Sequence, residues 1–123
     1  MNTKTVNIQV LALLGDAIFS LYIREELLKL GVNNPKKLQQ KSVDYVSAKG
    51  QVKILNNLID TSSLTEEELD IVKRGRNNKK ESHPKNTEII TYKLSTGFEA
   101  LLGDLYLNNK DRLMEILSKI EVK

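Results

Sequence analysis

The sequence of 123 residues contains no cysteine and a single histidine, His83. The absence of cysteine excludes a disulfide framework, a thiolate zinc site and a cysteine nucleophile. A single histidine also makes a histidine metal cluster or a catalytic triad hard to build. Any chemistry on this chain is therefore expected to depend on carboxylates.

Long apolar runs and strand patterns are missing as well. No stretch approaches the roughly 18 to 20 apolar residues that cross a bilayer, and the start, MNTKTVNIQV, lacks the apolar core of a signal peptide. Aromatic residues make up 5% of the chain, and no apolar–polar alternation typical of a half-buried strand is present. These absences favour an all-α, cytoplasmic enzyme or binding protein with no membrane contact. The length favours one domain over residues 1–123, whose core extends from about residue 6 to about residue 120.

Apolar residues recur at the three- and four-residue spacings of amphipathic helices. They predict helices over residues 6–30, 42–59, 91–108 and 111–120, a short helix over 35–40, and a helix that begins at the capping-box pair Thr65 and Glu68. The apolar positions that define the first helix are Val10, Leu13, Leu14, Ala17, Ile18, Leu21 and Leu28. The core face expected for 42–59 is Val43, Val46, Ile54, Leu55 and Leu58.

Positive charge is concentrated in one segment of a chain whose net charge is only +3. The basic residues from 73 to 85 are Lys73, Arg74, Arg76, Lys79, Lys80 and Lys85, and Glu81 is the acid among them. Residues 77–88 have no hydrophobic period and contain Pro84, so we expect a long loop here. This basic segment is a candidate contact for phosphate groups.

Two acids stand within otherwise apolar helical stretches. Asp16 lies in VLALLGDAIFSLYI and Glu99 lies in STGFEALLGDLYL. A pair of carboxylates brought together is an expected site for Mg²⁺, which keeps several waters and takes one or two protein carboxylates. The residues alone leave other readings open: Asp16 as a helix cap or a surface residue beside Gly15, and Glu99 as the partner of a lysine or arginine across the core.

The segments LALLGDAIFSLYIREELL, VSAKGQ, VKRGRNNK, PKNTE and STGFEALLGDLYL occur in this order and closely resemble the ribonuclease III family, in particular the bacterial Mini-ribonuclease III form that lacks a separate double-stranded RNA-binding domain. The resemblance extends from about Val6 to Leu117 and implies a helical catalytic domain. It also implies that Asp16 and Glu99 are the catalytic, metal-binding pair, with Mg²⁺ as cofactor and Mn²⁺ as a possible substitute. Longer members of the family carry further acids where this chain has Ala12 and Thr96, so the number of metal ions stays open.

The expected reaction is metal-assisted hydrolysis of phosphodiester bonds in double-stranded RNA. RNA recognition is expected through phosphates and 2′-hydroxyls, because the major groove of A-form RNA is too narrow for side chains to read. The candidate RNA-binding residues are Lys49, Arg74, Arg76, Asn77, Lys79, Lys80, Lys85 and Asn86. Each of them taken singly is more readily explained as a solvated surface residue, and their clustering on a long loop next to Glu99 is what favours a function. His83 is expected to be incidental.

The resemblance further implies a homodimer that processes a 23S ribosomal RNA precursor. A ribosomal protein is expected to assist this processing. A non-catalytic double-stranded RNA-binding or ribosome-associated dimer on the same fold is the main alternative, and a helical protein-interaction module is another. Because both motif acids, Asp16 and Glu99, are present, the enzyme is the favoured reading.

Overall fold

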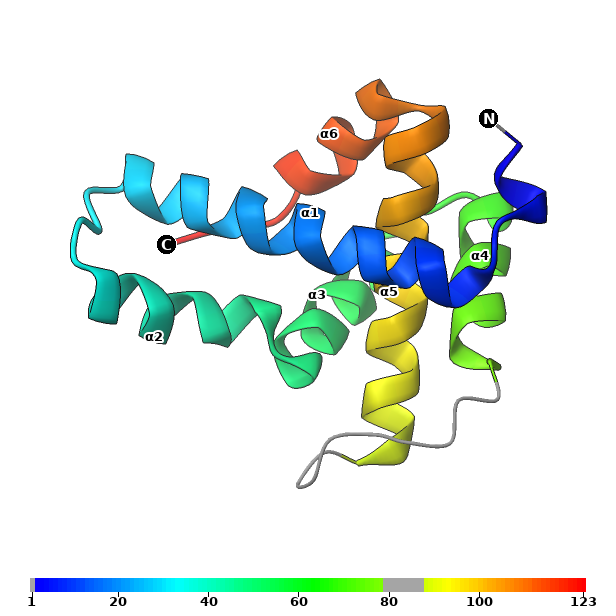
Figure 1. Cartoon of the computed structure of the whole chain (residues 1–123), viewed down its shortest axis with the longest axis horizontal. Coiled ribbons are helices and arrows are strands. Elements are labelled where there is room, and N and C mark those ends of the chain that lie inside the picture. Colours follow the sequence, from blue (N-terminus) through cyan, green and yellow to red (C-terminus); the bar gives the residue numbers. More distant parts are fainter. Residues whose placement is uncertain (1, 79–87) are drawn as a thin grey trace.

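The computed structural model describes residues 2–78 and 88–123, and all of their regular structure is helical. The elements are the 3₁₀ helix η1 (Thr3–Thr5) and the α-helices α1 (Ile8–Lys29), α2 (Pro35–Val46), α3 (Ala48–Asp60), α4 (Glu66–Arg76), α5 (Ile89–Asn108) and α6 (Lys110–Ser118). Figure 1 shows α5 running through the middle of the molecule and α1 crossing it at a steep angle. The predicted all-α fold is confirmed.

The ends of the helices follow from local side-chain chemistry. Asn7 caps α1, because its Oδ1 accepts a hydrogen bond from the backbone N–H of Gln9 at 2.7 Å. α1 stops at Gly31, whose φ of 93° suits glycine, and Gly15 does not split the helix. The predicted capping box is confirmed: the Thr65 side chain accepts from the Glu68 N–H, and the Glu68 carboxylate accepts from the Thr65 N–H.

The boundary between α2 and α3 lies at Ser47, several residues later than the sequence predicted. The Ser47 backbone is extended, and its hydroxyl caps α3 by accepting from the Gly50 N–H at 3.1 Å. Ser42, expected to begin the second helix, is buried within α2, where its hydroxyl donates to the Gln39 carbonyl at 2.8 Å. The prediction of a short helix ending near Gln40 was therefore wrong.

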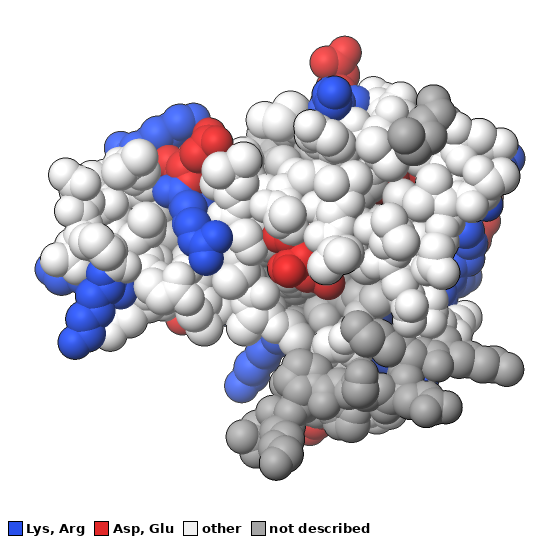
Figure 2. Space-filling model, in the orientation of Figure 1, with Lys and Arg blue, Asp and Glu red and all other residues white. Residues whose placement is uncertain are grey.

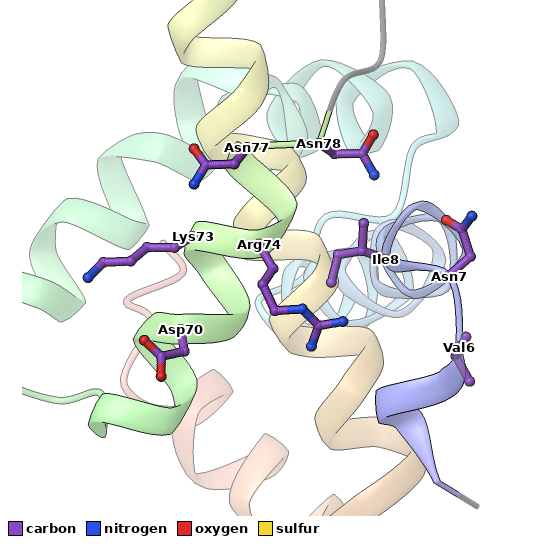
Figure 3. A pocket seen from close by; sticks show the side chains of 8 residues that line it. All are labelled: Val6, Asn7, Ile8, Asp70, Lys73, Arg74, Asn77 and Asn78. Atoms are coloured by element: carbon purple, nitrogen blue, oxygen red, sulfur yellow. The ribbon is translucent and has the colours of Figure 1, made fainter.

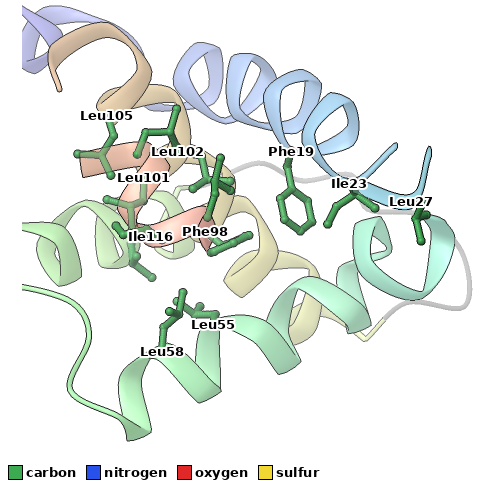
Figure 4. Close-up of a cluster of buried hydrophobic side chains, with 13 residues drawn as sticks. Phe19, Ile23, Leu27, Leu55, Leu58, Phe98, Leu101, Leu102, Leu105 and Ile116 are labelled. Carbon is green, nitrogen blue, oxygen red and sulfur yellow. The ribbon is translucent and has the colours of Figure 1, made fainter. Parts of the chain in front are cut away.

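The hydrophobic core surrounds α5, which packs against α1, α3, α4 and α6. Phe19 of α1 and Phe98 of α5 meet edge to face, with ring centroids 5.4 Å apart and planes at 88°. Figure 4 shows how α1, α3, α5 and α6 each supply side chains to this cluster. Its fully buried members include Phe19, Ile23, Leu27, Leu55, Phe98, Leu101, Leu102, Ile116 and Leu117.

The face of α1 that enters the core differs from the apolar positions that defined the helix in the sequence. Leu13 is 73% exposed, and Val10, Ala17, Leu21 and Leu28 are exposed as well. The buried positions are Leu11, Ala12, Gly15, Phe19, Ile23 and Leu27. Because α1 is apolar on nearly every side, its periodicity could not select the packed face.

The expected core face of residues 42–59 is correct only in part. Leu55 and Leu58 are buried, Val46 and Ile54 are half-buried, and Val43 is exposed. The break at Ser47 explains the difference, because it places Val43 on a different helix from Leu55.

Candidate active site

Asp16 and Glu99 line the same pocket, which has a volume of about 460 Å³. Asp16 comes from α1 and Glu99 from α5, and the start of α3 closes a further side. Figure 2 shows acidic side-chain atoms in a hollow near the middle of this face, where α1 crosses α5. The lining residues are Gln9, Ala12, Leu13, Asp16, Val46, Ser47, Ala48, Gln51, Tyr92, Ser95, Thr96 and Glu99.

Two glycines bring these acids together. A Cβ on Gly15 would overlap the backbone carbonyl of Glu99 and lie only 2.6 Å from its carbon atom. A Cβ on Gly103 would collide in the same way with the carbonyl group of Leu11, one turn away on each helix. The backbones of α1 and α5 can approach this closely only because both positions lack a side chain. Asp16, which directly follows Gly15, therefore lines the same pocket as Glu99.

The two carboxylates differ in their surroundings. Asp16 is exposed, so it carries none of the desolvation cost that burial within its apolar sequence would have imposed. Glu99 is half-buried, and its Oε2 accepts a hydrogen bond from Nε2 of Gln51 at 3.1 Å. One side of the pocket is thus open to solvent, and the other contains a carboxylate held by a neutral amide.

The donor set fits a hard cation such as Mg²⁺. It consists of two carboxylates, Asp16 and Glu99. Within residues 2–78 and 88–123, no larger group of three or more His, Cys, Asp or Glu side chains is placed to hold a metal ion. Ala12 and Thr96 line the pocket, and small or neutral neighbours leave room for the waters and phosphate oxygens that complete a Mg²⁺ shell. In the described part of the chain, the Oε1 of Gln51 is buried and has no hydrogen-bond partner.

Gln51 is the site residue that the sequence reasoning missed. It is only 1% exposed and lies on the same face of α3 as the buried Leu55 and Leu58. The spacing of these three residues, four and then three, is the helical core pattern, so a glutamine in the first of these positions was a readable signal.

A second hollow, of about 810 Å³, lies between α4 and the start of α1. Arg74 and Asn77, two of the predicted RNA contacts, line it together with Lys73 and Asn78. Figure 3 shows the Arg74 guanidinium reaching toward the start of α1, whereas Lys73 extends away from it. Asp70 also lines this hollow and reduces its positive charge.

A hydrogen bond connects the two hollows. Nε2 of Gln9, which lines the acidic pocket, donates to Oδ1 of Asn78, which lines the basic hollow, at 3.0 Å. Basic and acidic surfaces that adjoin in this way suit a phosphodiester backbone, because the cations could contact phosphates and the carboxylates could hold a metal ion that activates water.

The other predicted RNA contacts among the described residues, Arg76 and Lys49, do not line either hollow. Arg76 is half-buried, and its Nε donates to Asn77 Oδ1 at 3.1 Å. Lys49 is exposed on α3, and neither of the two hollows includes it. The remaining predicted contacts and the lone histidine lie outside the described residues, and they are Lys79, Lys80, Lys85, Asn86 and His83.

Comparison with known proteins defines the class to which this fold and site belong. A model of the ribonuclease III domain matches residues 9–110, which is most of the chain. A solved structure, that of protein FN1578 from Fusobacterium nucleatum, matches with a TM-score of 0.80 and 32% sequence identity over 97% of this chain and 95% of that one. No helix in the described ranges has the length and apolar character to cross a membrane.

The curated relatives narrow the class further. The Mini-ribonuclease 3 of Streptococcus pneumoniae is 40% identical over 119 residues, which cover 96% of this chain and 93% of that protein. The Mini-ribonuclease 3 of Brevibacillus brevis is 48% identical over 111 residues, 89% of this chain and 81% of that protein. The chain therefore belongs to the Mini-ribonuclease 3 group of the ribonuclease III family, which makes it an endoribonuclease and confirms the resemblance seen in the sequence.

Proposed function

We propose that this chain is a Mg²⁺-dependent endoribonuclease that cleaves double-stranded RNA at the pocket between α1 and α5. The observation that carries the proposal is the convergence of Asp16 and Glu99 on one pocket through the close approach at Gly15. Asp16 and Glu99 would hold the ion, and Mn²⁺ is expected to substitute for it. When bound, the ion supplies Lewis-acid activation of water and of the phosphodiester.

The basic hollow would position the RNA relative to this pocket. Arg74 is the leading contact, because its guanidinium reaches into the hollow and can bind a phosphate with two parallel hydrogen bonds. Asn77 offers an amide for a phosphate or a 2′-hydroxyl. The further proposed contacts are Lys49, Arg76, Lys79, Lys80, Lys85 and Asn86. Recognition would depend on the shape of the duplex, since phosphates and 2′-hydroxyls carry little sequence information.

A homodimer would allow both strands of the duplex to be cut. The exposed apolar residues of α1 lie beside the pocket: Leu13 is 73% exposed and lines the pocket together with Asp16, and Val10 and Leu21 are on the same helix. An exposed apolar face of this kind marks an interface, and two-fold pairing is the commonest assembly. We propose that a second copy covers this face, so that each dimer contains two pockets.

Family membership supports a double-stranded stem of a 23S ribosomal RNA precursor as substrate and one catalytic domain over residues 1–123. Such a substrate would place the protein in the bacterial cytoplasm. A ribosomal protein bound to the precursor would help recognition. The competing function is a non-catalytic double-stranded RNA-binding or ribosome-associated dimer, which would bind the same duplex without cutting it.

The decisive experiment is cleavage of a long perfect RNA duplex, compared with single-stranded RNA and duplex DNA, with Mg²⁺ and with EDTA. Asp16→Asn and Glu99→Gln should each abolish cleavage while folding and dimerisation persist. Asp60→Asn and Glu67→Gln make the same chemical changes at exposed positions outside the pocket, so these controls should cleave normally. Duplex binding by the wild type without any cutting would instead establish the non-catalytic function.

A further inference from the structure

Gln51 is a buried amide whose orientation is determined by its neighbours. Its Nε2 donates to Oε2 of Glu99 at 3.1 Å and to the backbone carbonyl of Val46 at 3.2 Å. Both partners are acceptors, so the amide nitrogen has to face them and Oε1 has to face away. The side chain thereby connects the α2–α3 corner to the carboxylate of Glu99 on α5.

Burying a glutamine side chain at this position costs free energy. The side chain is 1% exposed, and the next buried residues on this face of α3 are Leu55 and Leu58, so an apolar residue would satisfy packing alone. A buried amide loses its hydration, and its Oε1 has no hydrogen-bond partner among the described residues. The donor to Glu99 and the remaining acceptor both belong to a side chain that lines the pocket with Asp16.

We propose that Gln51 is a positioning residue for the metal site, and this inference rests on the function proposed above. Its Nε2 holds Oε2 of Glu99, so that the carboxylate keeps one orientation toward the pocket. Partners that orient metal-binding side chains in this way typically contribute about 10- to 100-fold to metal affinity or activity.

The test measures metal binding directly, without RNA, so that it does not depend on turnover. Mn²⁺ is titrated into the wild type and Gln51→Met, and free Mn²⁺ is followed by electron paramagnetic resonance. Methionine matches the length of glutamine and suits a buried position, but its thioether has no hydrogen to donate to Glu99. We expect Mn²⁺ to bind Gln51→Met about 10- to 100-fold more weakly. The control, Gln40→Met, makes the same change on an exposed face of α2 and should bind like the wild type.

A purely structural role for Gln51, through its bond to the Val46 carbonyl, makes a different prediction. It would lower the melting temperature of Gln51→Met and leave Mn²⁺ affinity unchanged in the folded protein. The positioning role instead raises the metal concentration needed for half-maximal cleavage and lowers kcat, with little change in KM for RNA. Gln51→Leu provides a second apolar side chain of different shape, and the positioning role requires the same loss of affinity from it.

The outcomes separate this inference from the proposed function. If the wild type binds Mn²⁺ and cuts duplex RNA while a folded Gln51→Met or Gln51→Leu binds Mn²⁺ equally well, the positioning role is wrong and the enzyme stands. If the wild type neither binds Mn²⁺ nor cuts RNA, both proposals are wrong. If both variants unfold at 25 °C, Gln51 is a structural residue and the positioning role is again overturned.

Discussion

Replacing Gly15 by alanine tests whether close helix contact assembles the candidate site. The new Cβ would overlap the backbone carbonyl of Glu99, lie 2.6 Å from its carbon atom and lie 3.0 Å from the Gly103 nitrogen. These atoms belong to the backbone of α5 and cannot rotate away as the end of a flexible side chain can. α1 and α5 must therefore move apart beside the pocket that Asp16 and Glu99 line.

The magnitude follows from two opposing effects. Overpacking of a tight contact costs about 1 to 3 kcal/mol, and a clash with backbone belongs at the upper end. Alanine recovers about 1 kcal/mol through its higher helix propensity. We expect the free energy of unfolding to fall by about 2 kcal/mol, which lowers the melting temperature by about 8 °C in a domain of this size. A shift of about 1 Å between Asp16 and Glu99 should reduce cleavage about 100-fold.

The assay combines urea unfolding, followed by circular dichroism, with cleavage rates measured well below the melting temperature. Gly31→Ala is the matched control. It also replaces glycine by alanine, but at a position with φ of 93° and no other group within 4 Å of the new Cβ. The control should lose about 1 to 2 kcal/mol through backbone strain and keep its cleavage rate. Wild-type stability and cleavage in Gly15→Ala would refute the role assigned to this contact.

Further predictions concern the fold, the RNA and the dimer. Arg112 donates to both carboxylate oxygens of Glu68 at 2.8 Å, and Glu68→Gln breaks this pair. The free energy of unfolding in urea should fall by about 2 kcal/mol in Glu68→Gln, and by under about 0.5 kcal/mol in Glu115→Gln, which changes an exposed partner of Arg112. The hydrogen bonds from Arg112 lower the pKa of Glu68 below its ordinary 4.5, so this contribution is complete above pH 4.5 and lost as the pH falls through the lowered value; acid titration of Glu68→Gln should lack this loss. Arg74→Ala should weaken duplex binding in EDTA and reduce the slope of log affinity against log salt by about 1, and an unchanged slope would exclude a phosphate contact. Leu13→Glu should give monomers in analytical ultracentrifugation, and a persistent dimer would place the interface elsewhere.

Much of the local structure could be predicted from neighbouring residues in the sequence. The Thr65–Glu68 capping box was predicted correctly because both partners lie within one helical turn. The stop at Gly31 depends in the same way on local backbone freedom. Asp16 and Glu99 were identifiable because a charged residue is conspicuous in an apolar stretch, and the family resemblance supplied their proposed roles.

Tertiary structure decided which surfaces meet. α1 is apolar on nearly every side, so its sequence could not show that Leu11 is buried while Leu13 is 73% exposed. That choice depends on Gly15 meeting Glu99, a contact between residues far apart in the chain, and no local pattern encodes it. Gln51 joins the site for the same reason, because its significance comes from a hydrogen bond to another helix. The sequence alone determined most of the helices and the two motif acids, whereas close backbone contact between helices determined which groups share a pocket.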